Sequence, residues 1–280
     1  SLSTPLVTGA MATLLGQRPG LDPRHLRSLL INTATPIADA DGKRLPVMKQ
    51  GAGRLHLDAA LASPVAVYPT SLHLGSSGGD FTIEKGVRLT NLSPVDTACN
   101  VIAEPRNGLA PVLEPERVSL AAGAADWFLL KWSGTAWAPG QYDGHLRVQC
   151  DGAEYPLSIP YWHGVTNGNP AAIKIATSIP TGKVGETLNY AAQFRLTDAA
   201  GLPVDSAKPM VTVKSGAGTV VGVTSQGSVF PGIYAVHVRP AAGATTLRSK
   251  GSSRWWTCAT PSRSRRRSIQ RRFRLSEPMS

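Results

Sequence analysis

The stretch FTIEKGVRLTNLS, residues 81–93, alternates apolar and polar side chains with the two-residue period of a half-buried β-strand. Similar runs precede and follow it, and turn residues such as Gly78-Gly79 and Pro139-Gly140 separate them. These runs are VAVYP (65–69), SLHLG (71–75), ACNVIAE (98–104), DWFLLKW (126–132), YDGHLRVQC (142–150) and YPLSIPYW (155–162). Seven strand candidates within about a hundred residues predict an antiparallel β-sandwich over residues 65–166.

Residues 167–246 repeat this style after a linker-like stretch, NGNP (167–170). The strand candidates here are AIKIATSIP (172–180), ETLNYAAQFRLTD (186–198), MVTVKSG (210–216), TVVGVTS (219–225) and GIYAVHVRP (232–240). We expect a second, immunoglobulin-like sandwich in this part of the chain.

The first 64 residues have helical patterns instead. TPLVTGAMATLLGQ (4–17) predicts a buried helix. Asp22-Pro23 predicts the start of a second helix, because Asp22 can cap free amides and Pro23 suits the first helical position. A polar loop follows, and GAGRLHLDAALA (51–62) predicts a short return to helix before a boundary at Ser63-Pro64.

The net charge of +11 is concentrated at the carboxyl end. From Leu247 onward nine arginines and Lys250 stand against Glu277 alone, so the preceding residues carry little excess charge and give no electrostatic reason to expect a nucleic-acid partner. Residues 247–280 are open to three interpretations: a basic arm, a disordered tail, or an out-of-frame translation that interrupts the second sandwich. We favour the last.

No run approaches the ~20 apolar residues of a membrane span, and the amino terminus lacks the layout of a signal peptide. A helical pattern starts almost at Ser1 with no lead-in. We interpret Ser1 as a break in a longer polypeptide.

The cysteines and acidic residues leave two questions open. Cys99 and Cys150 fall within one predicted sandwich, so they form either a disulfide or two buried free thiols. Asp39 and Asp41 could hold calcium, but their spacing fits no defined calcium loop, and we favour a polar turn. Cys258 completes the set of three, which has no metal-ligand spacing.

The opening phrase SLSTPLVTGAMATLL resembles the nucleophile segment of the subtilase family of serine proteases. In that family the segment reads Gly-Thr-Ser-Met-Ala-(Ala or Thr)-Pro-His-Val-Ala-Gly. Ser1 takes the place of the nucleophile, Leu2 replaces Met, and Leu6 stands where the family has His. Two later phrases, PGLDPRHLRSLLINTATPI (19–37) and GAGRLHLDAALA (51–62), resemble the segments that follow in subtilases.

The resemblance implies a mixed fold. Residues 1–64 would be the helical carboxy-terminal portion of an α/β catalytic domain, and residues 65–166 a fibronectin type III-like sandwich appended to it. An immunoglobulin-like sandwich (167–246) and a basic tail (247–280) would complete the chain. The helices would normally pack on an upstream parallel sheet, so we expect their apolar faces to be exposed here.

The resemblance also implies an activity. Ser1 would form the acyl-enzyme of an endopeptidase that cleaves proteins or peptides at the cell surface or outside the cell. The Asp and His of the triad and the oxyanion Asn would lie upstream, so the chain alone is expected to be inactive. No cofactor is implied, apart from optional calcium in the intact parent. The six histidines match no subtilase His motif, and we expect them on the surface or in packing: His25, His56, His73, His145, His163 and His237.

An alternative hypothesis belongs to another class of protein. The chain would be a non-catalytic extracellular β-sandwich protein for binding or adhesion, and Ser1 would only cap a supporting helix.

Overall fold

The computed structural model describes residues 1–178, 182–242, 244–249 and 255–259. The chain forms two compact units. The first contains residues 1–169 together with 197–202, and the second contains the other described residues. The predicted boundary at Ser63-Pro64 falls inside the first unit.

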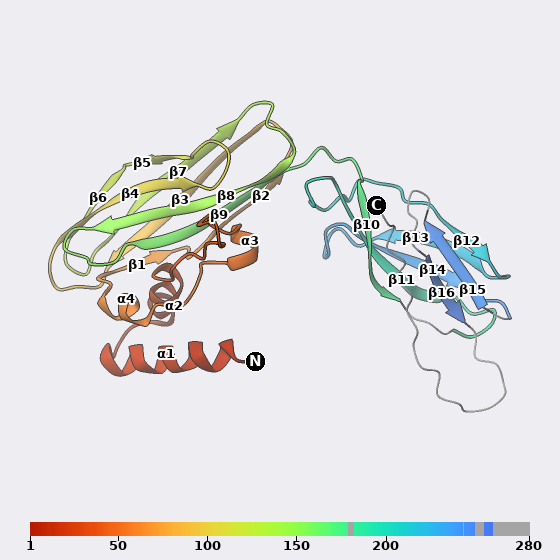
Figure 1. Ribbon diagram of the computed structural model, residues 1–280, viewed down its shortest axis with the longest axis horizontal. Helices are drawn as coiled ribbons and strands as arrows, with labels where there is room; N and C mark the ends of the chain where they lie inside the picture. The colour runs from red at the N-terminus through yellow and green to blue at the C-terminus, as the bar shows by residue number, and fades with distance from the viewer. Residues whose placement is uncertain (179–181, 243, 250–254, 260–280) are drawn as a thin grey trace. The chain divides into compact units, whose positions relative to one another are not determined.

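Four helices occupy the amino-terminal part of the first unit: α1 (Ser3–Gln17), α2 (Pro23–Asn32), α3 (Val47–Gln50) and α4 (Leu57–Ala62). Figure 1 shows α2 and α4 between α1 and the first strand, and the contacts agree. These helices share a small apolar cluster whose buried members are Ala10, Leu14, Leu26, Leu29, Leu30 and Ala60.

Helix α2 begins as its sequence predicts. The Asp22 carboxylate accepts hydrogen bonds from the amides of Arg24 (2.7 Å) and His25 (2.8 Å), and Pro23 opens the helix. The hydrogen bond from the His25 amide is the main cause that lowers the pKa of Asp22. The cap therefore fixes where the amphipathic stripe of α2 starts.

Nine strands form the first sandwich: β1 (Val65–Tyr68), β2 (Leu72–Ser77), β3 (Phe81–Asn91), β4 (Thr97–Pro105), β5 (Val112–Glu114), β6 (Arg117–Leu120), β7 (Ala125–Gly134), β8 (Gly140–Cys150) and β9 (Leu157–Val165). One sheet has the order β1-β3-β7-β5 and the other β2-β9-β8-β4-β6. All seven predicted runs contain strands. The short strands β5 and β6 were not predicted.

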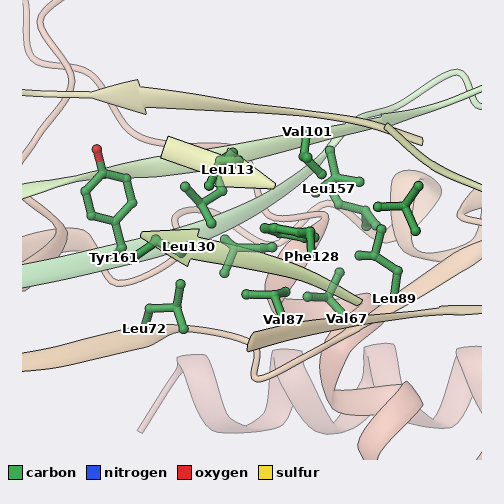
Figure 2. Packing of buried hydrophobic residues seen from close by; sticks show 14 of the residues in the cluster. Val67, Leu72, Val87, Leu89, Val101, Leu113, Phe128, Leu130, Leu157 and Tyr161 are labelled. Carbon is green, nitrogen blue, oxygen red and sulfur yellow. The ribbon is translucent and has the colours of Figure 1, made fainter. Parts of the chain in front are cut away.

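The core of this sandwich lies between the two sheets (Figure 2). Val87 and Phe128 come from one sheet, Leu146 and Ile159 from the other, and all four side chains are fully buried. Alternation along each strand sends these residues to the same side of their sheet. The sandwich prediction is confirmed by this packing.

One pairing differs from the purely antiparallel expectation. Strand β2 runs parallel to β9, with Leu72 opposite Tyr161. The chain leaves the first sheet at the end of β1 and enters the edge of the second sheet as β2, without making a hairpin. Alternation within one run predicts a strand but not its partner, so this crossing could not be predicted from the sequence.

Buried polar contacts join helix α2 to this sandwich. The side-chain amide of Asn32 donates to the backbone oxygens of Thr70 (2.9 Å) and Ser158 (3.0 Å). Ser28 donates to Asn32 (3.1 Å) and accepts the amide of Val67 (2.6 Å). We call Ser28 and Asn32 the polar joint. Both side chains are fully buried, and of these bonds only the one to Ser158 is partly open to water.

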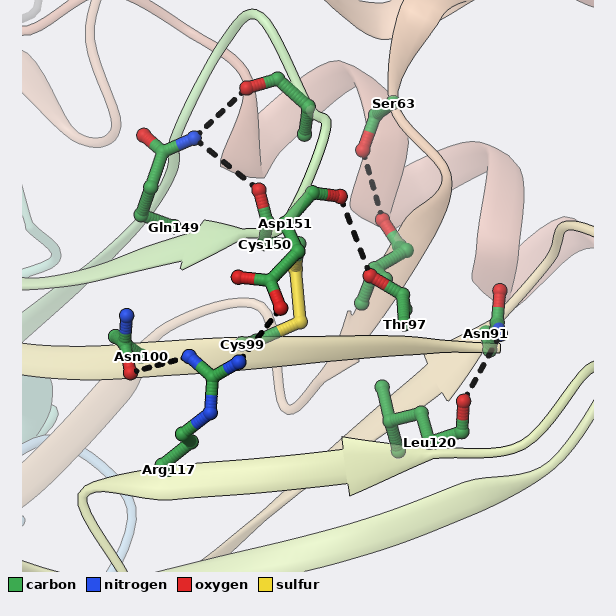
Figure 3. The surroundings of a disulfide bond; sticks show 12 residues. Ser63, Asn91, Thr97, Cys99, Asn100, Arg117, Leu120, Gln149, Cys150 and Asp151 are labelled. Atoms are coloured by element: carbon green, nitrogen blue, oxygen red, sulfur yellow. Dashed lines mark hydrogen bonds and ion pairs between the residues drawn. A yellow bond between two sulfur atoms is a disulfide. The ribbon is translucent and has the colours of Figure 1, made fainter. Parts of the chain in front are cut away.

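Cys99 and Cys150 form a disulfide between β4 and β8, where they stand directly opposite each other (Figure 3). This outcome resolves the open alternative in favour of the disulfide. Beside it at the surface, Arg117 contacts Asp151 at 2.6 Å and Asn100 at 3.0 Å.

The second unit is also a β-sandwich. Its sheets are β10-β11-β14-β13 and β12-β15-β16, formed by β10 (Ala172–Ser178), β11 (Leu188–Thr197), β12 (Val211–Ser215), β13 (Thr219–Ser225), β14 (Ile233–Arg239), β15 (Ala244–Ser249) and β16 (Trp255–Ala259). Phe194 and Tyr234 stack in its core, with ring centroids 5.7 Å apart. The five predicted strands are confirmed.

Strand structure continues past the predicted end of this sandwich. Strand β15 spans residue 247, and β16 pairs with it in antiparallel fashion. The first part of the predicted tail therefore belongs to a sheet. Residues 250–254 and 260–280 lie outside the described residues.

Candidate functional site

Ser1 lies at the entrance to helix α1 and is exposed. Leu2 occupies the N-cap, with φ −88° and ψ −31°, and provides no side-chain cap. The alternative hypothesis expects Ser1 at the N-cap, but the structure places Leu2 there. Because no side chain caps the helix, the backbone amides of its first turn donate to no capping side chain.

Helix α1 presents apolar side chains around most of its circumference. Only Ala10 and Leu14 are buried, so the described residues cover one stripe of the helix. A helix that is apolar on all sides is typical of a protein interior. Its large side chains that remain exposed are Leu2 (85%), Leu6 (68%), Val7 (43%), Met11 (36%) and Leu15 (43%). The predicted burial of α1 is therefore met on one side, and the expected exposure of apolar side chains is found on the others. The same expectation is wrong for α2, whose leucines are buried.

No hydrogen bond or ion pair links Ser1 to a histidine or a carboxylate within the part of the chain that the structure describes. A serine hydroxyl needs such a base for attack near neutral pH. Among the described residues, the predicted nucleophile Ser1 therefore has no base.

The six histidines have local partners elsewhere. His25 lies 3.5 Å from Asp22, His56 accepts the amide of Ala59, and His73 stacks on Trp162. His237 bonds to Thr224 and Asn189 through its two ring nitrogens. His145 and His163 are buried.

The structure brings together one serine and histidine that the sequence did not suggest. Ser77 Oγ lies 3.0 Å from Nε2 of His163, and burial lowers the pKa of His163. Among the described hydrogen bonds, no carboxylate contacts this imidazole. Because a catalytic triad needs a third group to orient the base, we interpret this pair as packing.

The described residues contain no cluster of three or more His, Cys, Asp or Glu that could hold a metal ion. Asp39 accepts the amides of Asp41 (3.1 Å) and Lys43 (2.8 Å) through one carboxylate oxygen. These two aspartates therefore lie in a polar turn. No described helix is long and apolar enough to cross a membrane.

The segment that carries Ser1, α1, α2 and α3 can be compared with known families. Residues 1–56 match the model of the subtilase family. This match supports the resemblance at the level of the family, for about a fifth of the chain. We call residues 1–56 the subtilase segment. No curated protein matches the chain.

The solved structures that match parts of the chain are remote in sequence and have low TM-scores. A protein of unknown function from Porphyromonas gingivalis W83 is 14% identical, covers 71% of this chain and 98% of its own, and has a TM-score of 0.34. The seventh PapD-like domain of human CEP192 is 13% identical, covers 38% and 87%, and scores 0.32. InvD of Yersinia pseudotuberculosis is 14% identical, covers 69% and 56%, and scores 0.29. At these scores the similarities say nothing about function.

Sequence reasoning missed a second group of polar residues. Asp143 and His145 lie two positions apart on β8 and are both 1% exposed. Residues two apart on a strand share a face, so two ionisable side chains in the run YDGHLRVQC were a usable signal of a buried polar contact.

Proposed function

We propose that this chain is part of a serine endopeptidase in which Ser1 attacks the peptide carbonyl and forms the acyl-enzyme. The observation that carries the proposal is the match of residues 1–56 to the subtilase family. The resemblance of the opening phrase SLSTPLVTGAMATLL to the family's nucleophile segment supports Ser1 in that role. The Ser1 backbone N–H, next to the uncapped start of α1, would stabilise the oxyanion of the tetrahedral intermediate.

The base of this reaction would come from outside the described residues. Ser1 has no histidine partner among them, and a hydroxyl without a base is a poor nucleophile. The chain alone would therefore be inactive. Peptide hydrolysis needs an aspartate and a histidine supplied by an upstream part of the catalytic domain.

The exposed apolar surface of α1 supports such a partner. Leu2 at the N-cap and Leu6 within the helix are 85% and 68% exposed, which is unusual for apolar side chains of this size so close together. We infer that the upstream part of the catalytic domain would cover this helix and hold Ser1 against the base.

Export is the proposed context. The disulfide between Cys99 and Cys150 is buried within the first sandwich, and structural disulfides persist in oxidising compartments. The substrates would then be extracellular proteins or peptides, and the sandwiches would brace the catalytic domain.

A fluorophosphonate probe tests this function on the parent protein that contains the upstream sequence. The probe should label Ser1, Ser1→Ala should abolish labelling, and the neighbouring Ser3→Ala should retain it. Unlabelled parent protein with native folding would contradict the proposal and favour the binding or adhesion hypothesis. The encoding DNA before Ser1 gives an independent check, because an open frame should lead through Gly-Thr into Ser1 and should contain Asp and His motifs.

A further inference from the structure

A group of charged side chains lies where the loop before α3 meets the first sandwich, within the first unit. The loop supplies Arg44, and the segment at the end of β4 supplies Glu104 and Arg106. Strand β8 supplies Asp143 and His145. We call these five residues the latch.

One ion pair and one hydrogen bond to a carboxylate cross from the loop to the sandwich. Arg44 Nη2 donates to Glu104 Oε2 at 3.0 Å. The amide of Val47, at the start of α3, donates to Asp143 Oδ2 at 2.5 Å. Asp143 is held in place by Arg106, which contacts its other carboxylate oxygen. The loop thus depends on two carboxylates of the sandwich.

His145 stands between these contacts. Its side chain is 1% exposed, Nδ1 lies 3.4 Å from Nη1 of Arg44, and Nε2 has no partner. Because Nδ1 faces a guanidinium donor, it must be the acceptor, and the single proton of the neutral ring belongs on Nε2. Burial, and then the charge of Arg44, lower the pKa of His145 to about 4, against the opposing pull of Asp143 and Glu104.

We propose that the latch is a pH-sensitive contact. It holds the loop against the first sandwich while His145 is neutral, and it releases the loop when His145 takes a second proton. The protonated ring can no longer accept from Arg44, and two positive charges then stand 3.4 Å apart in a buried setting. Displacement of Arg44 relieves this repulsion.

The surroundings of His145 allow this release. A surface cavity of about 400 Å³ lies beside the latch and is lined by Lys43, Arg44, Glu104, Pro105 and Arg106. Arg44 can move into it. Strand β9 contributes Tyr161, whose pKa is raised by burial, so this phenol stays neutral throughout the acidic range.

The size of the effect follows from proton linkage. A released His145 should have an ordinary pKa of about 6.5, compared with about 4 in the latch. Between pH 7.5 and 5.0 the released fraction should therefore rise roughly 25-fold. The released fraction rises as the pH falls, since His145 binds the proton more tightly in the released state.

Hydrogen exchange of the full 280-residue chain tests the proposal. The probe is the Val47 amide, and the internal reference is the Val101 amide, which donates to Glu116 at 2.8 Å within the sandwich. After correction for the intrinsic pH dependence of exchange, Val47 protection should fall roughly 25-fold relative to Val101 from pH 7.5 to 5.0.

Two variants distinguish a pH response caused by His145 from a general effect of acid on the protein. His145→Asn keeps an acceptor near Nδ1 but cannot titrate, and it should remove the pH response of Val47. His73→Asn changes an exposed histidine outside the latch and should preserve the response. Unchanged Val47 protection in the native chain, or a full response in His145→Asn, would overturn the proposal. If His145→Asn does not fold, the comparison of Val47 with Val101 in the native chain decides.

Discussion

Replacing Asn32 with alanine should weaken the attachment of helix α2 to the first sandwich. The substitution removes the amide that donates to the oxygens of Thr70 and Ser158. It also removes the oxygen that accepts from Ser28. Asn32 is fully buried, so water cannot replace these contacts without opening the joint.

The expected loss of unfolding free energy is about 3 kcal/mol. Three hydrogen bonds disappear, and each contributes about 1 kcal/mol net in a folded protein. The two abandoned carbonyls keep other options, since an oxygen can accept from more than one donor, and this limits the additional penalty.

Urea unfolding of the full chain, followed by tryptophan fluorescence, measures this loss. The matched control is Asn100→Ala, which removes one exposed contact with Arg117 at 3.0 Å and should cost less than about 1 kcal/mol. If both substitutions cost the same small amount, the polar joint does not stabilise the attachment. Our account of the first unit would then be refuted.

Leu6→Lys should reduce binding of a hydrophobic dye and change the free energy of unfolding by less than about 1 kcal/mol, because Leu6 is 68% exposed. Leu14→Lys should lower the free energy of unfolding by more than about 3 kcal/mol, because Leu14 is 0% exposed. Equal urea midpoints for the two variants would count against the described orientation of α1. Reduction of the disulfide between Cys99 and Cys150, which are 51 residues apart, should lower stability by about 4 kcal/mol, and an unchanged midpoint in reductant would disprove this. The pKa of His145 is lower in the folded chain than in the unfolded chain, so the free energy of unfolding should fall by up to about 3 kcal/mol as the pH drops from above about 6.5 to 4. His145→Asn should flatten this part of the plot of stability against pH.

The strands could be predicted from the sequence where apolar and polar residues alternate. The run FTIEKGVRLTNLS became the eleven-residue strand β3, and the Asp22-Pro23 signal marked the start of α2. Strand β5 could not be found in this way, because three residues contain too little alternation to distinguish a strand from a loop. Pairing was also beyond reach, since it depends on long-range packing.

The candidate site was predictable in a different sense. Ser1 could be singled out because its neighbours resemble a known segment, and the family match supports that resemblance. The contact between Arg44 and His145 could not be foreseen, because 101 residues separate them in the chain. The two buried ionisable residues on β8 were visible in the sequence, but their partners were not.

The polar joint also limits where this chain can be cut or fused. A gene fusion that begins at Ser63-Pro64 would carry the first sandwich away from Asn32 and expose the backbone oxygens of Thr70 and Ser158. A cut between Asn169 and Pro170 leaves the helices and the first sandwich together but removes residues 197–202, which belong to the same unit. The unit that can be transferred to another protein is therefore larger than the subtilase segment. A chimeric protein that takes Ser1 with α1 and α2 should also take this sandwich.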